Sequence, residues 1–258
     1  MRKNETLRMS NLINKAKRLI IPVVVVILGS GMGVSAAKRD YDQIAAKASR
    51  FFKYQEWANA AAMYELMIED SAKVTSTYGH AIVVAAMRKM PDYEISLMER
   101  AQQNLIPVDS IFNAVQHVSF GLGQSSLYEN FLLLVKERQP WMKRNIEKQL
   151  LNYYLFRRNA PEIIRYSEIM LSGAPENVNY MTSLAQGYML AGEEEAGIVK
   201  YKDILSLYPD DYNTLLTLGN YYAIKNYRTD ALTYLQRADS IKPTPYVSEL
   251  IKRLQGKD

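Results

Sequence analysis

The 258-residue sequence predicts an all-α protein, a solenoid of about six helical hairpins with a C-terminal capping helix. Three observations predict this fold class. Hydrophobic residues make up 48% of the chain while Gly and Pro number only 12 and 9, a balance that favours packed helices. Landmark residues recur at intervals of 34 residues. Residues of the helix-capping type stand in register at the same interval.

The repeat is clearest from residue 218 to residue 243, where apolar and small residues with helical spacing flank a polar turn. Two landmarks recur at each 34-residue step back along the chain: Pro243, Pro209 and Pro175, together with Tyr222, Tyr188 and Tyr154. The first three units share one frame. The last three share another, displaced by one residue between Pro140 and Arg144.

The period and the order of landmarks resemble the tetratricopeptide repeat, whose pattern runs W-x2-L-G-x2-Y, then A-x3-F, then P. The last unit matches best, through Leu215, Leu218, Gly219, Tyr222, Ala231, Leu235 and Pro243. Leu replaces the usual Trp and Phe, which preserves apolar bulk. The resemblance implies a right-handed α-solenoid over 38–258, with units at about 41–74, 75–108, 109–143, 144–177, 178–211 and 212–245 and a capping helix at 246–256.

The starts of the helices are predicted from side chains that accept hydrogen bonds from free backbone amides. The first helix of each unit is expected to begin at a residue of this type: Asp42, Ser76, Ser110, Asn145, Asn179 and Asn213. A capping box of Ser126 with Glu129 is expected to begin a second helix.

The first 37 residues have the three-part order of a secretory signal, with a basic region, an apolar run from Leu19 to about Val34, and small residues ending at Ala37. The run of roughly 16 apolar residues is shorter than a typical membrane-spanning helix. Cleavage near Ala36 or Ala37 is favoured, and an uncleaved membrane anchor is the alternative. Both place the domain outside the cytoplasm. Because no Asn-x-Ser/Thr sequon follows the leader, we expect the periplasm or the extracytoplasmic face of a bacterial membrane.

Composition excludes several classes of function. The formal charge of +5 lies entirely in the leader, which has six basic residues and one acidic residue, so 26 of each remain beyond it. Nucleic-acid binding is therefore not expected, because it draws on clustered positive charge. The absence of Cys excludes disulfides, thiolate catalysis and Cys-ligated metals.

No local pattern predicts a metal, a cofactor or an enzyme. The only two histidines, His80 and His117, lie 37 residues apart and have no ligand-spaced partner. The glycines at 121 to 126 join two helices and are not followed by the Lys of a phosphate loop. The acidic run at 193 to 195 suits the start of a helix. No nucleophile, base and carboxylate constellation assembles from local spacing, so the chain is predicted to be non-catalytic.

If the units stack as the resemblance implies, their first helices line a concave groove, and equivalent residues form a ladder along it. One ladder consists of Ser49, Val83, His117, Asn152, Gln186 and Asn220, and its last four side chains can both donate and accept hydrogen bonds. Beside it lie Asn113, Lys148 and Thr182, with apolar surface from Phe120, Leu155 and Met189. Amide side chains both donate and accept hydrogen bonds, which suits an extended peptide backbone. The predicted binding residues are therefore Asn113, His117, Lys148, Asn152, Gln186 and Asn220; the alternative is ordinary polar surface. Since Lys148 is the only basic residue beside the ladder, a clamp for a partner's C-terminal carboxylate is not expected.

The predicted function is a non-catalytic protein–protein interaction scaffold of the cell envelope that binds a partner peptide or helix in the groove. The alternatives are a cell-wall or glycan-active protein, a glycan-binding helical-repeat protein, and a membrane-tethered assembly factor. A membrane is expected as a partner only if the leader is retained.

Overall fold

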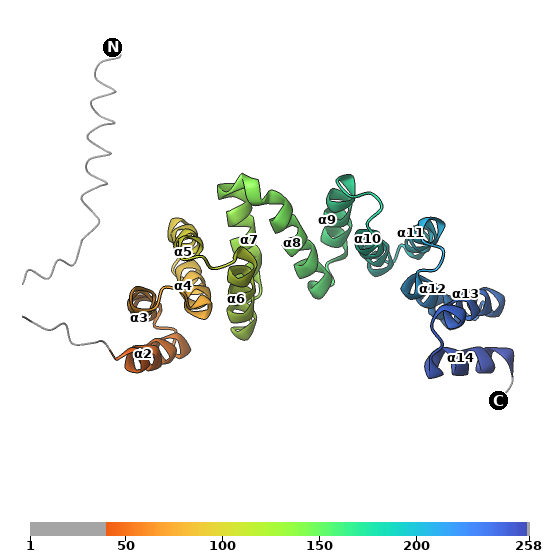
Figure 1. The fold of residues 1–258 in the computed structure, drawn as a ribbon, viewed down its shortest axis with the longest axis horizontal. Helices are drawn as coiled ribbons and strands as arrows, with labels where there is room; N and C mark the ends of the chain where they lie inside the picture. Colours follow the sequence, from red (N-terminus) through yellow and green to blue (C-terminus); the bar gives the residue numbers. More distant parts are fainter. Residues whose placement is uncertain (1–39, 257–258) are drawn as a thin grey trace, which may run out of the picture. The chain divides into compact units, whose positions relative to one another are not determined.

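The computed structural model describes residues 40–256, so the predicted leader and its cleavage site lie outside the described residues. The described part holds thirteen α-helices and no strand (Figure 1). Their bounds are α2 (Tyr41–Lys53), α3 (Trp57–Asp70), α4 (Thr75–Met87), α5 (Pro91–Gln103), α6 (Val108–Gly121), α7 (Ser126–Arg138), α8 (Lys143–Arg157), α9 (Ala160–Ser172), α10 (Val178–Ala191), α11 (Glu194–Leu207), α12 (Tyr212–Ile224), α13 (Arg228–Ile241) and α14 (Pro245–Gln255). A short 3-10 turn, Pro140–Met142, precedes α8.

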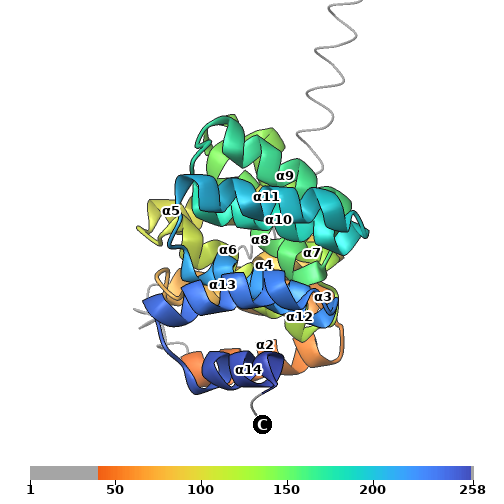
Figure 2. The ribbon, with the colours of Figure 1, turned by 90° about the vertical axis from the view of Figure 1, so that its right-hand side faces the viewer.

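Consecutive helices pack as six hairpins, from α2 with α3 to α12 with α13, and α14 packs on α13 at the C-terminal end (Figure 2). Between hairpins the packing varies. Helix α4 packs extensively on α6, whereas α9 packs on both α8 and α10. The fold-class prediction of an all-α chain of stacked hairpins with a C-terminal helix is confirmed.

Each hairpin turn contains one residue with positive φ, in the left-handed region that lets the chain reverse after a helix. These residues are Gln55, Lys89, Gly123, Arg158, Gly192 and Asn226. Successive members are 34 residues apart, except for 35 between Gly123 and Arg158. The extra residue falls in the unit boundary where the sequence frame also shifts. Only two of the six are glycine, so glycine content alone does not reveal this register.

The predicted starts of the first helices are wrong by two or three residues. The observed caps are Asp40, Val74, Pro107, Met142, Asn177 and Asp211. The side chains of Asp40, Asn177 and Asp211 accept hydrogen bonds from backbone amides three residues later. Cap-type residues therefore stand at the true starts in three units, and the predicted ones lie inside the first turn.

The capping box predicted at Ser126 and Glu129 does not form. Helix α7 has Ser125 at its cap position, and no side chain caps its first amides. The Glu129 carboxylate instead accepts a hydrogen bond of 2.6 Å from the Tyr154 hydroxyl of α8. A contact between units has replaced the local one.

The buried side chains form three clusters that follow the chain. The first runs from α2 to α9, the second joins α10, α11 and α12, and the third joins α13 with α14. Each helix pair therefore buries its apolar face on its neighbours, as expected for a repeat protein.

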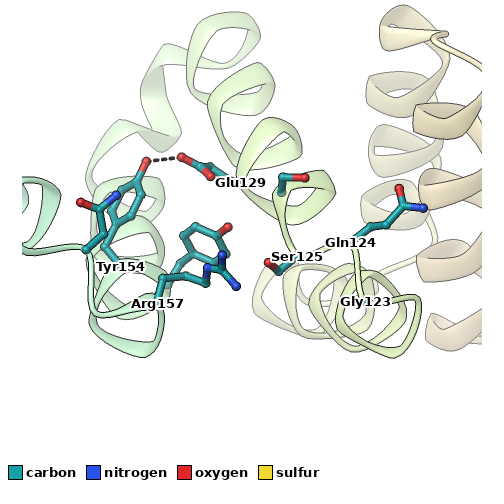
Figure 3. Close-up of a pocket in the computed structure, with 9 residues that line it drawn as sticks. Gly123, Gln124, Ser125, Glu129, Tyr154 and Arg157 are labelled. Carbon is teal, nitrogen blue, oxygen red and sulfur yellow. Dashed lines mark hydrogen bonds between the residues drawn. The ribbon is translucent and has the colours of Figure 1, made fainter.

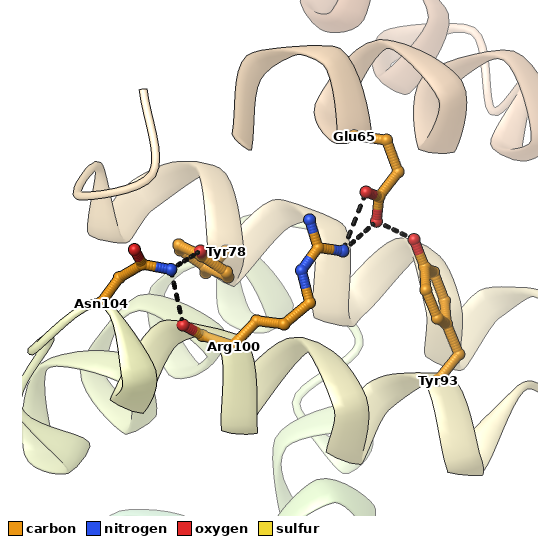
Figure 4. A network of polar contacts seen from close by, with 5 residues as sticks. All are labelled: Glu65, Tyr78, Tyr93, Arg100 and Asn104. Atoms are coloured by element: carbon orange, nitrogen blue, oxygen red, sulfur yellow. Dashed lines mark hydrogen bonds and ion pairs between the residues drawn. The ribbon is translucent and has the colours of Figure 1, made fainter. Parts of the chain in front are cut away.

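A polar network fastens α3 to α5 within the first cluster (Figure 4). The Arg100 guanidinium donates to both carboxylate oxygens of Glu65, at 2.9 and 2.8 Å. The Tyr93 hydroxyl donates to the same carboxylate. Close by, the Asn104 amide bridges the Tyr78 hydroxyl and the Arg100 carbonyl. The network fixes the second unit against the first, and through α4 it supports α6.

The close packing of α4 on α6 depends on Gly79. A Cβ atom at this position would lie 2.7 Å from the Ala114 Cβ and 2.9 Å from its carbonyl carbon, so Gly79→Ala forces the two backbones apart. We expect Gly79→Ala to lower the free energy of unfolding by about 1–3 kcal/mol, measured by urea denaturation. Gly121→Ala is the matched control, because nothing lies within 4 Å of its added Cβ. Equal losses for the two variants would show that helix packing is not the cause.

Candidate functional site

Helices α6 and α8, the first helices of units 3 and 4, are joined near both ends. At their N-terminal ends, the Asn145 and Gln149 side-chain amides of α8 donate to Asp109 Oδ1 of α6, at 3.3 and 3.5 Å. At their C-terminal ends, the Phe120 and Phe156 ring centroids are 5.0 Å apart. The two helices therefore run in the same direction, linked by side chains and each packed on α7.

Polar side chains stand between these two contacts. Asn113 and His117 lie one turn apart on α6, and Lys148 and Asn152 lie one turn apart on α8, so each pair shares a face of its helix. All four are exposed. Within residues 40–256, the side chains of Asn113, Lys148 and Asn152 have no hydrogen bond or ion pair. Four of the six predicted binding residues therefore lie exposed on these two helices, two on each.

The aromatic pair closes the C-terminal end of this surface. Phe156 is 65% exposed, and Phe120 and Leu155 are half-buried. We name the surface made by Asn113, His117, Phe120, Lys148, Asn152 and Phe156 the α6–α8 face. Phe156 was not among the predicted binding residues, although its spacing of four residues from Asn152 and eight from Lys148 places it on the same side of α8.

The other two predicted residues lie on later helices. Gln186 is exposed on α10, and α9 packs on both α8 and α10 (Figure 1). Asn220 lies on α12, where its Oδ1 accepts a hydrogen bond of 3.0 Å from the Tyr246 hydroxyl of α14. At the last unit, this ladder position is engaged by the chain's own C-terminal helix.

Three other residues proposed for the groove have different environments. Ser49 is exposed on α2. Val83 is only 1% exposed, so the ladder is interrupted in the second unit. Met189 turns towards Gly197 of its own hairpin, where its sulfur lies 2.6 Å from the position that a Cβ would take. Met189 is half-buried, and its sulfur end fills the space above that glycine.

The two histidines have different surroundings, since His80 packs among aromatic rings and His117 is exposed on α6. His80 Nδ1 lies 2.8 Å from the Ser76 carbonyl oxygen, and its ring packs on Phe52 and Tyr64 at 5.0 and 5.4 Å. Burial lowers the pKa of His80, and the nearby His117 lowers it further. Among the described residues, no three His, Asp or Glu side chains are grouped as metal ligands. None of the described helices has the length and apolar character needed to cross a membrane.

Comparison with known proteins gives likenesses of fold only. No family model matches the chain, and no curated protein matches it. A tetratricopeptide repeat protein from Parabacteroides merdae is 12% identical, with 84% of this chain and 87% of that one covered and a TM-score of 0.47. The C-terminal part of a TPR repeat-containing protein from Cytophaga hutchinsonii is 14% identical, covering 80% and 98%, with a TM-score of 0.37. The TPR2AB domain of yeast Sti1, in its pHSP90 complex, is 14% identical, covering 83% and 98%, with a TM-score of 0.39. The fold assignment rests on the helix pairs described above.

Proposed function

We propose that this chain is a non-catalytic protein-interaction scaffold that binds an extended peptide segment of a protein partner on the α6–α8 face. The observation that carries the proposal is the set of unpaired polar groups between two fixed contacts. Asn113 and Asn152 each offer an amide donor and a carbonyl acceptor to solvent. An extended backbone presents the complementary groups, and a peptide held in this way needs no strand edge.

The last unit supports the proposal that an Asn at this ladder position binds another segment. Asn220 stands two 34-residue steps after Asn152, at the same place in the repeat. Its amide oxygen accepts a hydrogen bond from Tyr246, which belongs to a segment docked from outside the hairpin. Asn152 has the same chemical group on a face that no described segment covers.

The face is also preorganised for binding. Both of its helices are held by buried cores, and the Asp109 and Phe120 contacts fix their spacing before any ligand arrives. Little ordering of the scaffold is therefore needed on association, which favours affinity. The exposed ring of Phe156 supplies the kind of aromatic anchor that dominates many interfaces.

A display experiment tests the proposal. The full chain, kept soluble in mild detergent, selects linear peptides from a random phage library, and fluorescence anisotropy measures the affinity of each. The triple variant Asn113→Ala, Asn152→Ala, Phe156→Ala is expected to weaken binding by about 100-fold or more, from two lost hydrogen bonds and one anchor. Circular dichroism checks that the variant folds.

The control is Asn130→Ala with Gln236→Ala, which removes two exposed amides from the second helices α7 and α13. Its affinity should stay within about twofold of the wild type. Selected peptides that bind the triple variant as tightly as the wild type would contradict the proposal.

We also propose that residues 1–37 direct export, so that the scaffold acts in a bacterial cell envelope. The support is the order of basic, apolar and small residues in the leader. Fractionation followed by intact-mass measurement tests this. An N-terminus at Lys38 in the periplasm means cleavage, and Met1 or its successor in the membrane fraction means a retained anchor. Recovery of the protein in the cytosol would contradict export.

A further inference from the structure

A pocket of about 380 Å³ lies beside the C-terminal end of the α6–α8 face (Figure 3). It is formed by the turn between α6 and α7 and by the last turns of α8. The residues that matter for its chemistry are Ser125, Glu129, Tyr153, Tyr154 and Arg157. Tyr153 connects the pocket to the face, because its ring packs edge-on against Phe120 with centroids 6.3 Å apart.

The same arrangement occurs again two units later. Tyr153 and Arg157 recur two 34-residue steps along the chain as Tyr221 and Lys225. These two line a second pocket, of about 640 Å³, with Glu194 at the start of α11. There the Glu194 carboxylate accepts a hydrogen bond of 2.9 Å from the Tyr221 hydroxyl and pairs with Lys225 Nζ at 2.7 Å. The Lys225 contact and the Tyr221 hydrogen bond together lower the pKa of Glu194. A tyrosine and a cation at this place in the repeat thus hold a carboxylate.

The first pocket has the tyrosine and the cation but no carboxylate at the position of Glu194. The positive-φ glycines set the register: Glu194 follows Gly192 by two residues, and Ser125 follows Gly123 by two. Ser125 therefore stands where Glu194 stands. Burial raises the pKa of Tyr153, while Ser125 lowers it and Glu129 raises it, so both of these side chains lie next to the Tyr153 hydroxyl. Within residues 40–256, Arg157 forms no ion pair.

Glu129 is the one carboxylate that lines the first pocket, and its partners are the tyrosine hydroxyls of the pocket and not Arg157. Its Oε1 accepts the hydrogen bond from Tyr154, whose pKa is raised by burial and by Glu129 itself, so this hydroxyl stays protonated and donates. Figure 3 shows Glu129 turned towards Tyr154, with Arg157 and Ser125 away from that hydrogen bond. The Arg157 side of the pocket is left for an anion from outside the chain.

We propose that this pocket binds the carboxylate of an Asp or Glu side chain on the peptide that occupies the α6–α8 face. Arg157 is the ion-pair partner, as Lys225 is for Glu194, and the Ser125 hydroxyl is the hydrogen-bond donor, because Tyr153 already lies against Glu129. A guanidinium suits this role because it meets a carboxylate with two parallel hydrogen bonds. The proposal adds a preference for acidic residues to the proposed function, and it rests on that function for the rest of the peptide.

A small-molecule titration tests the pocket without any peptide. The probe is the α-amide of N-acetylglutamate, and the readout is the NMR signal of the Arg157 Nε–H group in the full chain. We expect this signal to shift at millimolar concentrations of the probe. The matching glutamine amide should require a concentration at least about tenfold higher for the same shift. Ser125→Glu, which supplies an internal carboxylate at the place of Glu194, should abolish the response. No shift, or equal shifts with both probes, would overturn the proposal.

A double-mutant cycle tests the pocket in the peptide complex. Each acidic residue of a face-binding peptide is replaced by Gln, and both peptides are measured against the wild type and Arg157→Gln. At one acidic position, we expect the acidic peptide to bind Arg157→Gln about tenfold more weakly than it binds the wild type. The peptide with Gln at that position should bind both proteins with affinities that differ by less than about twofold. Ser125→Glu should weaken the acidic peptide similarly.

The two proposals fail in different ways. If peptides bind the face, and are lost in the Asn113, Asn152 and Phe156 triple variant, but no acidic residue couples to Arg157, the pocket proposal is wrong and the face proposal stands. If the glutamate probe shifts Arg157 and no peptide binds the face, the pocket is a carboxylate site and the peptide-binding proposal is wrong.

Discussion

Phe112→Ala is expected to lower the free energy of unfolding by about 3–5 kcal/mol, because it leaves a cavity in the centre of the first core cluster. Phe112 is fully buried on α6, and its ring lies 6.2 Å from that of Phe131 on α7. Helix α6 also carries the packing of α4 and the polar residues Asn113 and His117. A loosened α6 therefore weakens the candidate site as well as the core.

Phe156→Ala is the matched control for this cavity. It removes the same side chain from a position that is 65% exposed, so we expect a stability change within about 1 kcal/mol. Urea denaturation followed by circular dichroism measures both variants. If the two variants lost similar amounts of unfolding free energy, the placement of Phe112 in the core would be contradicted. The affinity for peptide should fall for both variants.

Lys136→Met is expected to destabilise the protein by about 3 kcal/mol, because it removes the main partner of a buried carboxylate. Glu147 of α8 is only 3% exposed, and its Oε1 pairs with Lys136 Nζ of α7 at 3.2 Å. A second lysine, Lys143, lies 4.0 Å from the same oxygen and is largely exposed. The buried pair fixes α8 on α7, and therefore the orientation of the α8 half of the face.

Two further variants isolate the cause. Lys143→Met should lower the free energy of unfolding by less than about 1 kcal/mol, since the contact of Lys143 with Glu147 is longer, exposed and screened by solvent. The double variant Lys136→Met, Glu147→Leu removes both charges and should recover most of the stability lost by Lys136→Met. A double variant as unstable as Lys136→Met alone would show that lost packing, and not an unpaired carboxylate, causes the loss.

The hairpins were predictable because a 34-residue period repeats their apolar landmarks. The period defines which residues are equivalent, and the positive-φ turn residues from Gln55 to Asn226 follow it closely. The exact helix starts were less predictable. Units 1, 5 and 6 carry a second cap-type residue two positions earlier, and both candidates satisfy the same local rule.

The candidate site was predictable only in part, because a period says nothing about how closely neighbouring helices approach. The Gly79 contact lets α4 pack so near α6 that Val83 is buried, and the ladder stops there. The link between α6 and α8 depends on Asp109 and Phe120, whose partners lie 36 to 40 residues away in the chain and follow no local pattern. The pocket could not be predicted from the sequence, because only the positive-φ residues Gly123 and Gly192 show that Ser125 and Glu194 occupy equivalent positions.

Site-specific photo-crosslinking tests the central claim, that the α6–α8 face is the peptide-binding surface. Phe156 is replaced by p-benzoylphenylalanine, which keeps an aromatic ring at the proposed anchor, and the chain is irradiated with a selected peptide. Tyr54, 64% exposed in the first hairpin turn, carries the same substitution as a control matched in exposure. We predict a cross-linked product from position 156 and none from position 54. A bound peptide that cross-links from position 54, and not from position 156, would contradict the account.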